Sequence, residues 1–462
     1  PDFSITSNGG ADFISPDPTV ALTGRAPFAV VSIEVNGVPF PVTWTTLTAW
    51  QITVPLGGRT NILELVGRDL RGQLVAGAID TITIEYNGSI PQPDEWVVIN
   101  EIMYNPAQSY AEFIELHIRH PSFAFDLSGF QMSGVDFILP PGSFIQPNGF
   151  LVLVENRAVF GNVYDPLLPV LGPYAGNLQR NGETLRLIRR GATAAEDVVI
   201  DEVRYENVAP WPVLADGFGP SAQLIDPEQD NRRAGNWAST TVNDPDRATP
   251  GRVNAVRQLI EPYPEIWLNE IAPVNLAGPT DGFGEREPWL ELFNGGSTVI
   301  ELNGFALSDD AAQLGKWQFP TGARILPGQF LLVWLDGETP ENSATELHTS
   351  FRVSSTNGVI VLSRAQGATS ATVDHLRYLV TSAENSFGFY PDGDPRRRRM
   401  LYVQTPGGPN DETLPNVQVA INEWMAAGHS VIRDPADNQF EDWFELLRRQ
   451  SNIVPGRLAF RD

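Results

Sequence analysis

Hydrophobic and polar residues alternate in short segments over the first 90 or so residues of the chain. A period of two is typical of strands that bury one face. Val30–Val35 and Val38–Val42 flank Asn36-Gly37, a dipeptide that favours a two-residue hairpin turn. Further alternating segments lie at 51–54, 61–66 and 81–86. Because no segment has the helical period, residues 1–88 are predicted to form an immunoglobulin-like β-sandwich.

A longer pattern then repeats along the chain. An apolar segment with Asn-Glu at its centre occurs at Val98–Met103, Trp267–Ile271 and Ala420–Met425. The recurring Asn100, Asn269 and Asn422 are separated by 169 and 153 residues. Such intervals are far longer than the roughly 20 to 50 residues of a solenoid unit. The chain is therefore predicted to be an array of similar domains.

Further motifs set the expected bounds of these domains. Each Asn-Glu segment precedes an acidic-aromatic strand, at Glu112–Leu116, Trp289–Phe293 and Asp442–Leu446. The first two copies continue in the same order to closing Thr-Pro-Gly segments, Thr249–Asn254 and Thr405–Asn410. Gly-Asn-Trp (Gly235–Trp237) precedes the close of the first copy only. We expect domains at residues 95–256 and 264–410, and an incomplete third copy at 417–462.

The ordered motifs from about Val97 to Asn410 resemble the lamin-tail domain, and more narrowly its bacterial branch. The resemblance rests on Asn-Glu-Ile, the Glu-Leu strand, Leu-Ser/Asn-Gly-Phe, the Leu-Pro-Pro-Gly variants and the closing Thr-Pro-Gly-x-x-Asn. It implies tandem immunoglobulin-like β-sandwiches without catalytic residues. It also implies a large secreted or cell-surface bacterial protein in which such domains are repeated.

Composition agrees with an all-β array. The chain has 41 Gly and 38 Pro, which favour turns over long helices. Its net charge of −25 disfavours binding to nucleic acid or to an anionic membrane surface, and no apolar run is long enough to insert as a membrane helix. The absence of cysteine removes disulfides and thiolate chemistry, and favours a bacterial over an animal extracellular origin.

Paired carboxylates are the first candidates for chemistry: Glu101 with Glu115, Glu270 with Glu291, and Glu423 with Glu445. Two carboxyl groups in one cleft could act as a glycosidase acid and base. Their recurrence in every copy favours instead a structural role, in which each accepts hydrogen bonds from the backbone or from the neighbouring Asn. His117 and His120 are interpreted as surface residues, and no hydrolase, phosphate-binding or zinc motif is present. We expect no enzyme activity within this chain.

Calcium is the cofactor that the acidic loops would hold. One candidate loop contains Asp434, Asp437, Asn438, Glu441 and Asp442, and its counterpart in the preceding copy contains Asp281, Glu285 and Glu287. All of these side chains offer the hard oxygen atoms that calcium prefers. The pattern favours a solvated acidic turn, with a calcium site as the alternative.

Two other groups of residues are candidates for ligand binding. The run Arg396 to Arg399 follows Asp392 and Asp394 and lacks interleaved aromatic residues, which favours a solvated or internally paired loop. Trp44, Trp50, Trp211 and Trp317 lie in or near turn-rich segments, where a sugar-binding platform could form. Most tryptophans of β-sandwiches lie in the core, so core positions are favoured and the platform is the alternative.

The sequence therefore favours a non-catalytic structural or interaction array of a secreted or cell-surface bacterial protein. It would space or present modules and bind protein partners or further copies of itself. The alternative is a carbohydrate-binding accessory segment of a larger secreted enzyme. A catalytic domain outside this chain is compatible with both functions.

Overall fold

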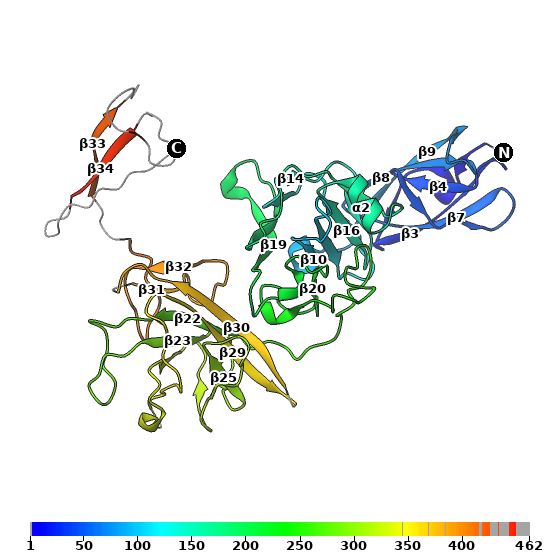
Figure 1. The fold of residues 1–462 in the computed structure, drawn as a ribbon. Helices are drawn as coiled ribbons and strands as arrows, with labels where there is room; N and C mark the ends of the chain where they lie inside the picture. The colour runs from blue at the N-terminus through cyan, green and yellow to red at the C-terminus, as the bar shows by residue number, and fades with distance from the viewer. Residues whose placement is uncertain are drawn as a thin grey trace.

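The computed structural model describes residues 2–343, 345–367, 369–383, 385–414, 418–425, 433 and 443–449. Within them, antiparallel sheets dominate and helices are short, which confirms the expected all-β class. Figure 1 shows the units following one another, from the blue N-terminal sandwich through the green unit to the yellow and orange one. No helix among the described residues is both long and apolar enough to cross a membrane.

The first unit is a sandwich of two sheets with the strand orders β1-β3-β7-β6 and β2-β9-β8-β4-β5. The hairpin predicted at Asn36-Gly37 is confirmed, since Val35 pairs with Val38 and both turn residues have positive φ. The elements are β1 (Ser4–Ile5), η1 (Ser7–Gly10), β2 (Phe13–Ser15), β3 (Thr19–Arg25), β4 (Ser32–Val35), β5 (Val38–Phe40), β6 (Thr43–Trp44), β7 (Ala49–Pro55), β8 (Thr60–Arg68) and β9 (Leu74–Tyr86).

The second unit has three sheets, ordered β17-β16-β11-β10-β20-β21, β14-β13-β18-β19 and β12-β15. Its elements are α1 (Pro93–Trp96), β10 (Val97–Met103), β11 (Phe113–Ile118), β12 (Phe125–Asp126), β13 (Gln131–Ser133), β14 (Phe137–Ile138), β15 (Phe144–Ile145), β16 (Phe150–Val154), α2 (Arg157–Val163), β17 (Val170–Leu171), β18 (Glu183–Arg189), η2 (Ala194–Glu196), β19 (Val198–Tyr205), η3 (Val213–Ala215), β20 (Ala222–Leu224), η4 (Ala234–Asn236) and β21 (Trp237–Ala238).

The third unit has sheets ordered β28-β23-β22-β31-β32, β26-β25-β29-β30 and β24-β27. Its elements are β22 (Ile266–Ala272), β23 (Trp289–Asn294), β24 (Ile300–Glu301), β25 (Phe305–Ser308), β26 (Trp317–Gln318), β27 (Arg324–Ile325), β28 (Phe330–Trp334), η5 (Thr339–Glu341), β29 (Asn357–Gln366), β30 (Thr369–Leu379), β31 (Ser386–Phe389) and β32 (Arg398–Leu401).

The second and third units repeat one topology. Each places its Asn-Glu strand (β10 or β22) between the acidic-aromatic strand (β11 or β23) and a strand near its end (β20 or β31). In both, the register of the first pair shifts at the recurring Asn, so that Glu101 pairs with Glu115 and Glu270 with Glu291. The bulge brings two carboxylates side by side on neighbouring strands.

A helix that the sequence did not indicate covers one sheet of the second unit. The Asn156 side chain caps α2 by accepting hydrogen bonds from the amides of Ala158 and Val159. Phe160 of α2 packs on Phe113 and Val154 and buries the second face of that sheet. Both faces of β16 are therefore buried from Leu151 to Val154.

The last pair of strands, β33 (Gln418–Met425) and β34 (Trp443–Arg449), repeats the same register. Glu423 pairs with Glu445 after a shift at Asn422, and Asn422 Nδ2 lies 2.8 Å from Glu445 Oε1. The hairpin therefore has the strand register of the repeat, while Ile421 and Trp424 are exposed to solvent.

Candidate functional site

The paired carboxylates of the second unit hold its closing segment onto its first strands. Glu101 accepts hydrogen bonds from Ser221 Oγ at 2.5 Å and from the amide and hydroxyl of Thr249, both at 2.8 Å. Glu115 accepts from Asn100 Nδ2 at 2.8 Å and from the Gly251 amide at 2.5 Å. The prediction that these glutamates accept hydrogen bonds from the neighbouring Asn and the backbone is confirmed.

The third unit contains the same network. Glu270 accepts from the Ser386 hydroxyl, from the Thr405 amide, and from Thr405 Oγ1 at 2.9 Å. Glu291 accepts from Asn269 Nδ2 at 3.2 Å and from the Gly407 amide at 2.6 Å. We call this arrangement the closing latch: the recurring Asn, the two Glu residues, and the Thr-Pro-Gly segment that they bind.

A second asparagine completes each latch. Asn254 Nδ2 donates to the carbonyls of Asn100 and Leu224, both at 2.9 Å. Asn410 Nδ2 donates to the carbonyls of Asn269 and Phe389 at 3.2 and 2.7 Å. The last Asn of each unit therefore binds the strand on which the first Asn lies.

Burial dominates the electrostatics of the latch. All four glutamates are fully buried. Burial raises the pKa of Glu101 and Glu270 to about 7 and that of Glu291 to about 8, against the lowering effect of their hydrogen bonds. The pKa of Glu115 is raised well above its usual range, first by burial and then by the charge of Glu101. Perturbed carboxyl groups often mark active sites, but these face protein donors rather than a cleft.

The calcium candidates fall into two groups. Asp434, Asp437, Asn438, Glu441 and Asp442 lie outside the described residues. In the other loop, Asp281 is buried, whereas Glu287 forms an ion pair with Arg352 at 2.5 Å. Asp281 is joined by Glu341 and His348, and the exposed Glu285 by Glu338 and Glu341, in two clusters of converging side chains. The fold therefore adds three residues that the sequence did not single out and turns Glu287 toward an arginine.

The histidine interpretation was wrong for His117. Its ring is buried, stacks on Phe150 with centroids 4.5 Å apart, and places Nδ1 3.0 Å from the Gly149 carbonyl. It lies on β11, which is buried on both faces, so a polar side chain on this strand is not at the surface. His120 is half-buried and contacts the ring of Trp96.

The tryptophan platform was likewise wrong for three of its four residues. Trp50, Trp211 and Trp317 are buried in the cores of their units. Trp44 is half-buried and lines an open groove of about 900 Å³ together with the exposed Phe28, Leu47 and Leu70. The groove lies at the end of the first sandwich away from the second unit: Ser32, at the start of β4, pairs with Arg68 of β8, whereas Thr60, at the other end of β8, pairs with Glu85 beside the junction.

The arginine run is internally paired at three positions. Arg396 pairs with Asp394 at 2.8 Å, Arg398 with the buried Asp374 at 3.4 Å, and Arg399 with Glu412 at 3.0 Å. The interpretation of this run as a paired loop is confirmed for these three residues.

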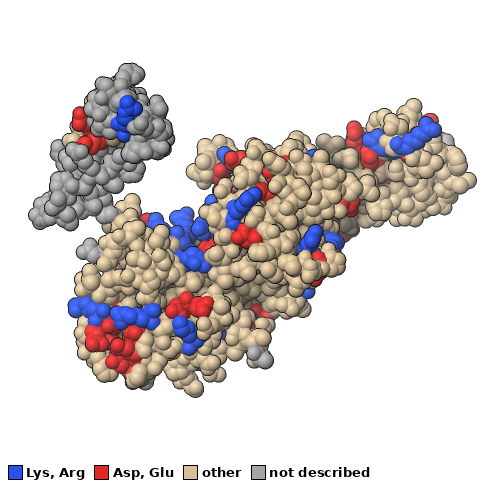
Figure 2. Space-filling model, viewed as in Figure 1, with Lys and Arg blue, Asp and Glu red and all other residues tan. Residues whose placement is uncertain are grey.

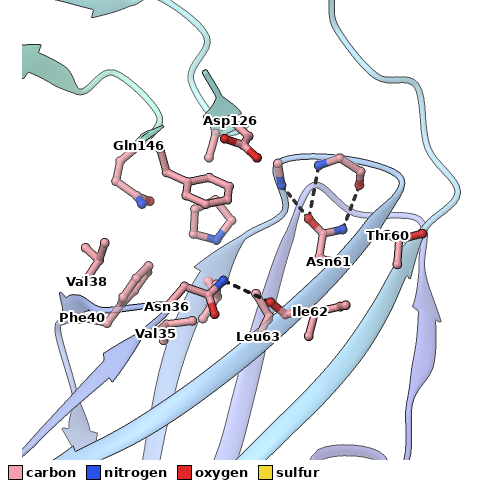
Figure 3. Close-up of a pocket in the computed structure, with 16 residues that line it drawn as sticks. Val35, Asn36, Val38, Phe40, Thr60, Asn61, Ile62, Leu63, Asp126 and Gln146 are labelled. Atoms are coloured by element: carbon pink, nitrogen blue, oxygen red, sulfur yellow. Dashed lines mark hydrogen bonds between the residues drawn. The ribbon is translucent and has the colours of Figure 1, made fainter. Parts of the chain in front are cut away.

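The first and second units share one continuous hydrophobic core. Tyr86, at the end of β9, contacts Phe123 of the second unit with ring centroids 5.8 Å apart. Arg59 Nη1 binds the carbonyls of Tyr86 and Gly88, which fixes the start of the connecting segment. Figure 3 shows the pocket left at this junction, with Asp126 and Gln146 facing Asn36 and Asn61. Its volume of about 130 Å³ is below the roughly 300 Å³ at which ligand pockets begin.

The second and third units are joined by Arg233, whose side chain is about 2% exposed. Its Nη1 donates to the carbonyls of Ile266 and Val373 at 3.0 and 3.1 Å, and its Nη2 to that of Pro264 at 3.2 Å. The guanidinium carbon lies 3.5 Å from the centroid of the Trp267 ring. This set of contacts combines charged hydrogen bonds with a desolvated cation–π contact.

The unmatched Gly-Asn-Trp motif lies at the same junction. A Cβ on Gly235 would stand 2.1 Å from the carbonyl oxygen of Thr372, a separation that only glycine avoids. A second contact joins Arg377 of β30 to Glu206, with Nε 3.0 Å from Oε2. The motif occurs before the close of the second unit because that is where the backbone of the third unit approaches.

No curated protein matches the chain. Among solved structures, a Bacteroides ovatus protein, the mixed-linkage glucan utilization locus SGBP-B in complex with a mixed-linkage heptasaccharide, is similar at 14% identity and a TM-score of 0.13. That alignment covers 33% of this chain and 47% of the other, so it spans about half of that protein. Within the third unit and the segment leading into it, residues 262–378 match the lamin tail domain family.

Proposed function

We propose that this chain is a non-catalytic, stiff spacer of a secreted or cell-surface bacterial protein, which presents modules and partner-binding surfaces at fixed separations. In this proposal residues 95–256 form a second lamin-tail-like domain and residues 1–88 an immunoglobulin-like module. The shared strand order and the repeated latch support the first assignment. The high negative charge and the lack of cysteine are compatible with an exposed, bacterial location.

The observation that carries the proposal is the joint at Arg233. Flexible domain arrays connect independent cores by solvated linkers, which leaves relative motion as the default. Here one buried guanidinium binds three carbonyl groups and a tryptophan of the next unit. Since each charged hydrogen bond contributes about 1.5–3 kcal/mol, loss of this side chain would free the joint.

Distance measurements between spin labels test this stiffness directly. The chain has no cysteine, so Leu167→Cys and Leu326→Cys, both at exposed positions, place one label on each side of the joint. We expect one narrow distance distribution in this double variant, and a broad one after Arg233→Ala. Arg190→Ala is the matched control, because Arg190 pairs with Asp197 inside the second unit. A broad distribution without the Arg233 change would refute the spacer.

Carbohydrate binding is the second candidate, and the groove around Trp44 favours it. The half-buried indole lies among exposed apolar residues, with Asp69 and Arg71 beside it. An aromatic ring flanked by polar groups is suited to a sugar face. This function requires saturable binding of the protein on a glycan array. Trp44→Ala should weaken that binding at least tenfold. Phe218→Ala, at an exposed aromatic residue of the second unit, should leave it unchanged. The spacer function predicts no saturable binding in any of these proteins.

A further inference from the structure

Two connections of the third unit, β22–β23 and β28–β29, meet at one end of its larger sheet. Asp281 lies between β22 and β23, Glu341 ends η5, and His348 follows it. Because Ala272 pairs with Trp289 and Trp289 with Trp334, the strands flanking these loops end together. On this unit, Figure 2 shows acidic side chains gathered beside a band of Lys and Arg.

The three side chains converge closely. One ligand atom each from Asp281, Glu341 and His348 lie within 4.8 Å of one another. Glu285 and Glu338 form an overlapping cluster with Glu341, within the same limit. Four carboxyl groups and an imidazole are thus close together. The carboxylates repel one another, and a bound cation would offset this repulsion.

A separate observation concerns unpaired atoms. Asp281 is 6% exposed and His348 is fully buried. Asp281 Oδ1 accepts the amides of Phe283 and Glu285, whereas Oδ2 is buried without a hydrogen-bond partner. Glu341 Oε2 lies 3.9 Å from His348 Nδ1, which is too far for a hydrogen bond, and both Glu341 Oε2 and His348 Nε2 are buried without a hydrogen-bond partner. Buried polar atoms normally have partners, so three unpaired atoms on three converging residues indicate a ligand.

The Asp336 carboxylate also fixes the orientation of the His348 imidazole. His348 Nδ1 lies 2.7 Å from Asp336 Oδ2, and Asp336 Oδ1 accepts the Glu338 amide at 3.0 Å. When Nδ1 donates to that carboxylate, the neutral ring carries its lone pair on Nε2. A carboxylate that fixes the tautomer of an imidazole in this way commonly supports a metal-binding histidine.

We propose that Asp281, Glu341 and His348 bind a divalent first-row transition-metal ion such as Zn²⁺, with Glu285 and Glu338 as neighbouring carboxylates. An imidazole with carboxylates suits these ions, whereas calcium takes oxygen ligands only. Atoms bound at about 2.1 Å from zinc lie about 3.4 Å apart, so the cluster needs a closure of roughly an ångström. The partly exposed Glu341 side chain can provide it.

The local electrostatics favour a cation at this position. The Glu341 carboxylate converges with that of Asp281 in one cluster and with those of Glu285 and Glu338 in the other, which places like charges close together. A divalent ion would remove this repulsion. Glu287 belongs to the same loop but is neutralised by Arg352, so it takes no part in the site.

Metal titration of the full chain tests the proposal. After treatment with chelator, calorimetric titration with Zn²⁺ is expected to show one saturable site, and Zn²⁺ to raise the melting temperature. Asp281→Asn retains Oδ1 as an acceptor, and Glu341→Gln preserves shape at a partly exposed position. Each should weaken Zn²⁺ binding at least tenfold. Glu287→Gln, in the same loop, should bind Zn²⁺ with the same affinity as the unchanged protein.

Several results would overturn the assignment. One is the absence of saturable Zn²⁺ binding to the unchanged protein. Another is equal affinity in Asp281→Asn, Glu341→Gln and Glu287→Gln, which would place the ion elsewhere. Stabilisation by Ca²⁺ without stabilisation by Zn²⁺ would show that the site uses oxygen ligands alone and that His348 is not a ligand.

Discussion

Asn269→Ala is expected to open the closing latch of the third unit. The fully buried side chain donates to Glu291 and, at 2.9 Å, to Asp392, and it accepts the Gly393 amide at 3.1 Å. Alanine leaves all three partners without this bond. Since a hydrogen bond contributes about 1 kcal/mol and a buried group left unsatisfied costs about 1–3 kcal/mol, we expect a loss of about 3 kcal/mol or more. The Gly407 amide, which donates to Glu291, should then exchange with solvent roughly 100-fold faster in hydrogen-exchange measurements.

Asn357→Ala provides the control for this variant. Asn357 is exposed at the start of β29, where a substitution should change stability by no more than about 0.5 kcal/mol. If the Gly407 amide exchanges equally slowly in both variants, the latch does not hold the closing segment.

Stability should fall as the pH rises from about 5 to about 8.5. The pKa values of Glu101, Glu270 and Glu291 are all raised, so the folded state binds protons that the unfolded chain releases near pH 4.5. The stability from these groups is complete below pH 4.5 and is lost as the pH passes through 7 to 8. A shift from 4.5 to about 7 corresponds to about 3 kcal/mol for one group. Calorimetry at the two pH values should show a higher melting temperature at pH 5.

Glu291→Gln separates this effect from general charge repulsion. It changes the net charge of −25 by a single unit, yet it removes one of the strongly shifted groups. The variant should be less stable overall, because its amide group meets the donors Asn269 and Gly407, and its stability should depend less on pH. An unaltered pH dependence would show that the latch glutamates titrate normally.

The repeat itself could be predicted from the sequence, because the latch uses residues that are adjacent in short motifs. Asn100 and Glu101 adjoin each other in the chain, and the partners Thr249, Gly251 and Asn254 lie within six residues. Their recurrence in Thr405, Gly407 and Asn410 signalled a common structure. The sequence did not show which glutamate oxygen binds each of these partners. That choice depends on the strand register, which is set by the bulge at Asn100.

The proposed metal site of Asp281, Glu341 and His348 could not be predicted in the same way, and neither could the joint at Arg233. Asp281 and His348 are 67 residues apart, and only the common end of β22, β23 and β28 brings them together. Arg233 binds backbone carbonyl groups, which nearly every residue has, so the sequence does not show which residues are its partners. The usable signal was indirect: Gly235, in a motif present in only one copy, marks the approach of another backbone.

The closing latch also has a consequence for synthesis on the ribosome. The Thr405 hydroxyl binds Glu270, a partner 135 residues earlier, and the corresponding pair Thr249 and Glu101 is 148 residues apart. Contacts so distant in sequence make folding slow, since a long loop must close before they form. Each of these two units therefore leaves the ribosome with its carboxylates unpaired, and it can close only after its last few residues have been synthesised. The order of translation thus becomes the order of closure, one unit after another.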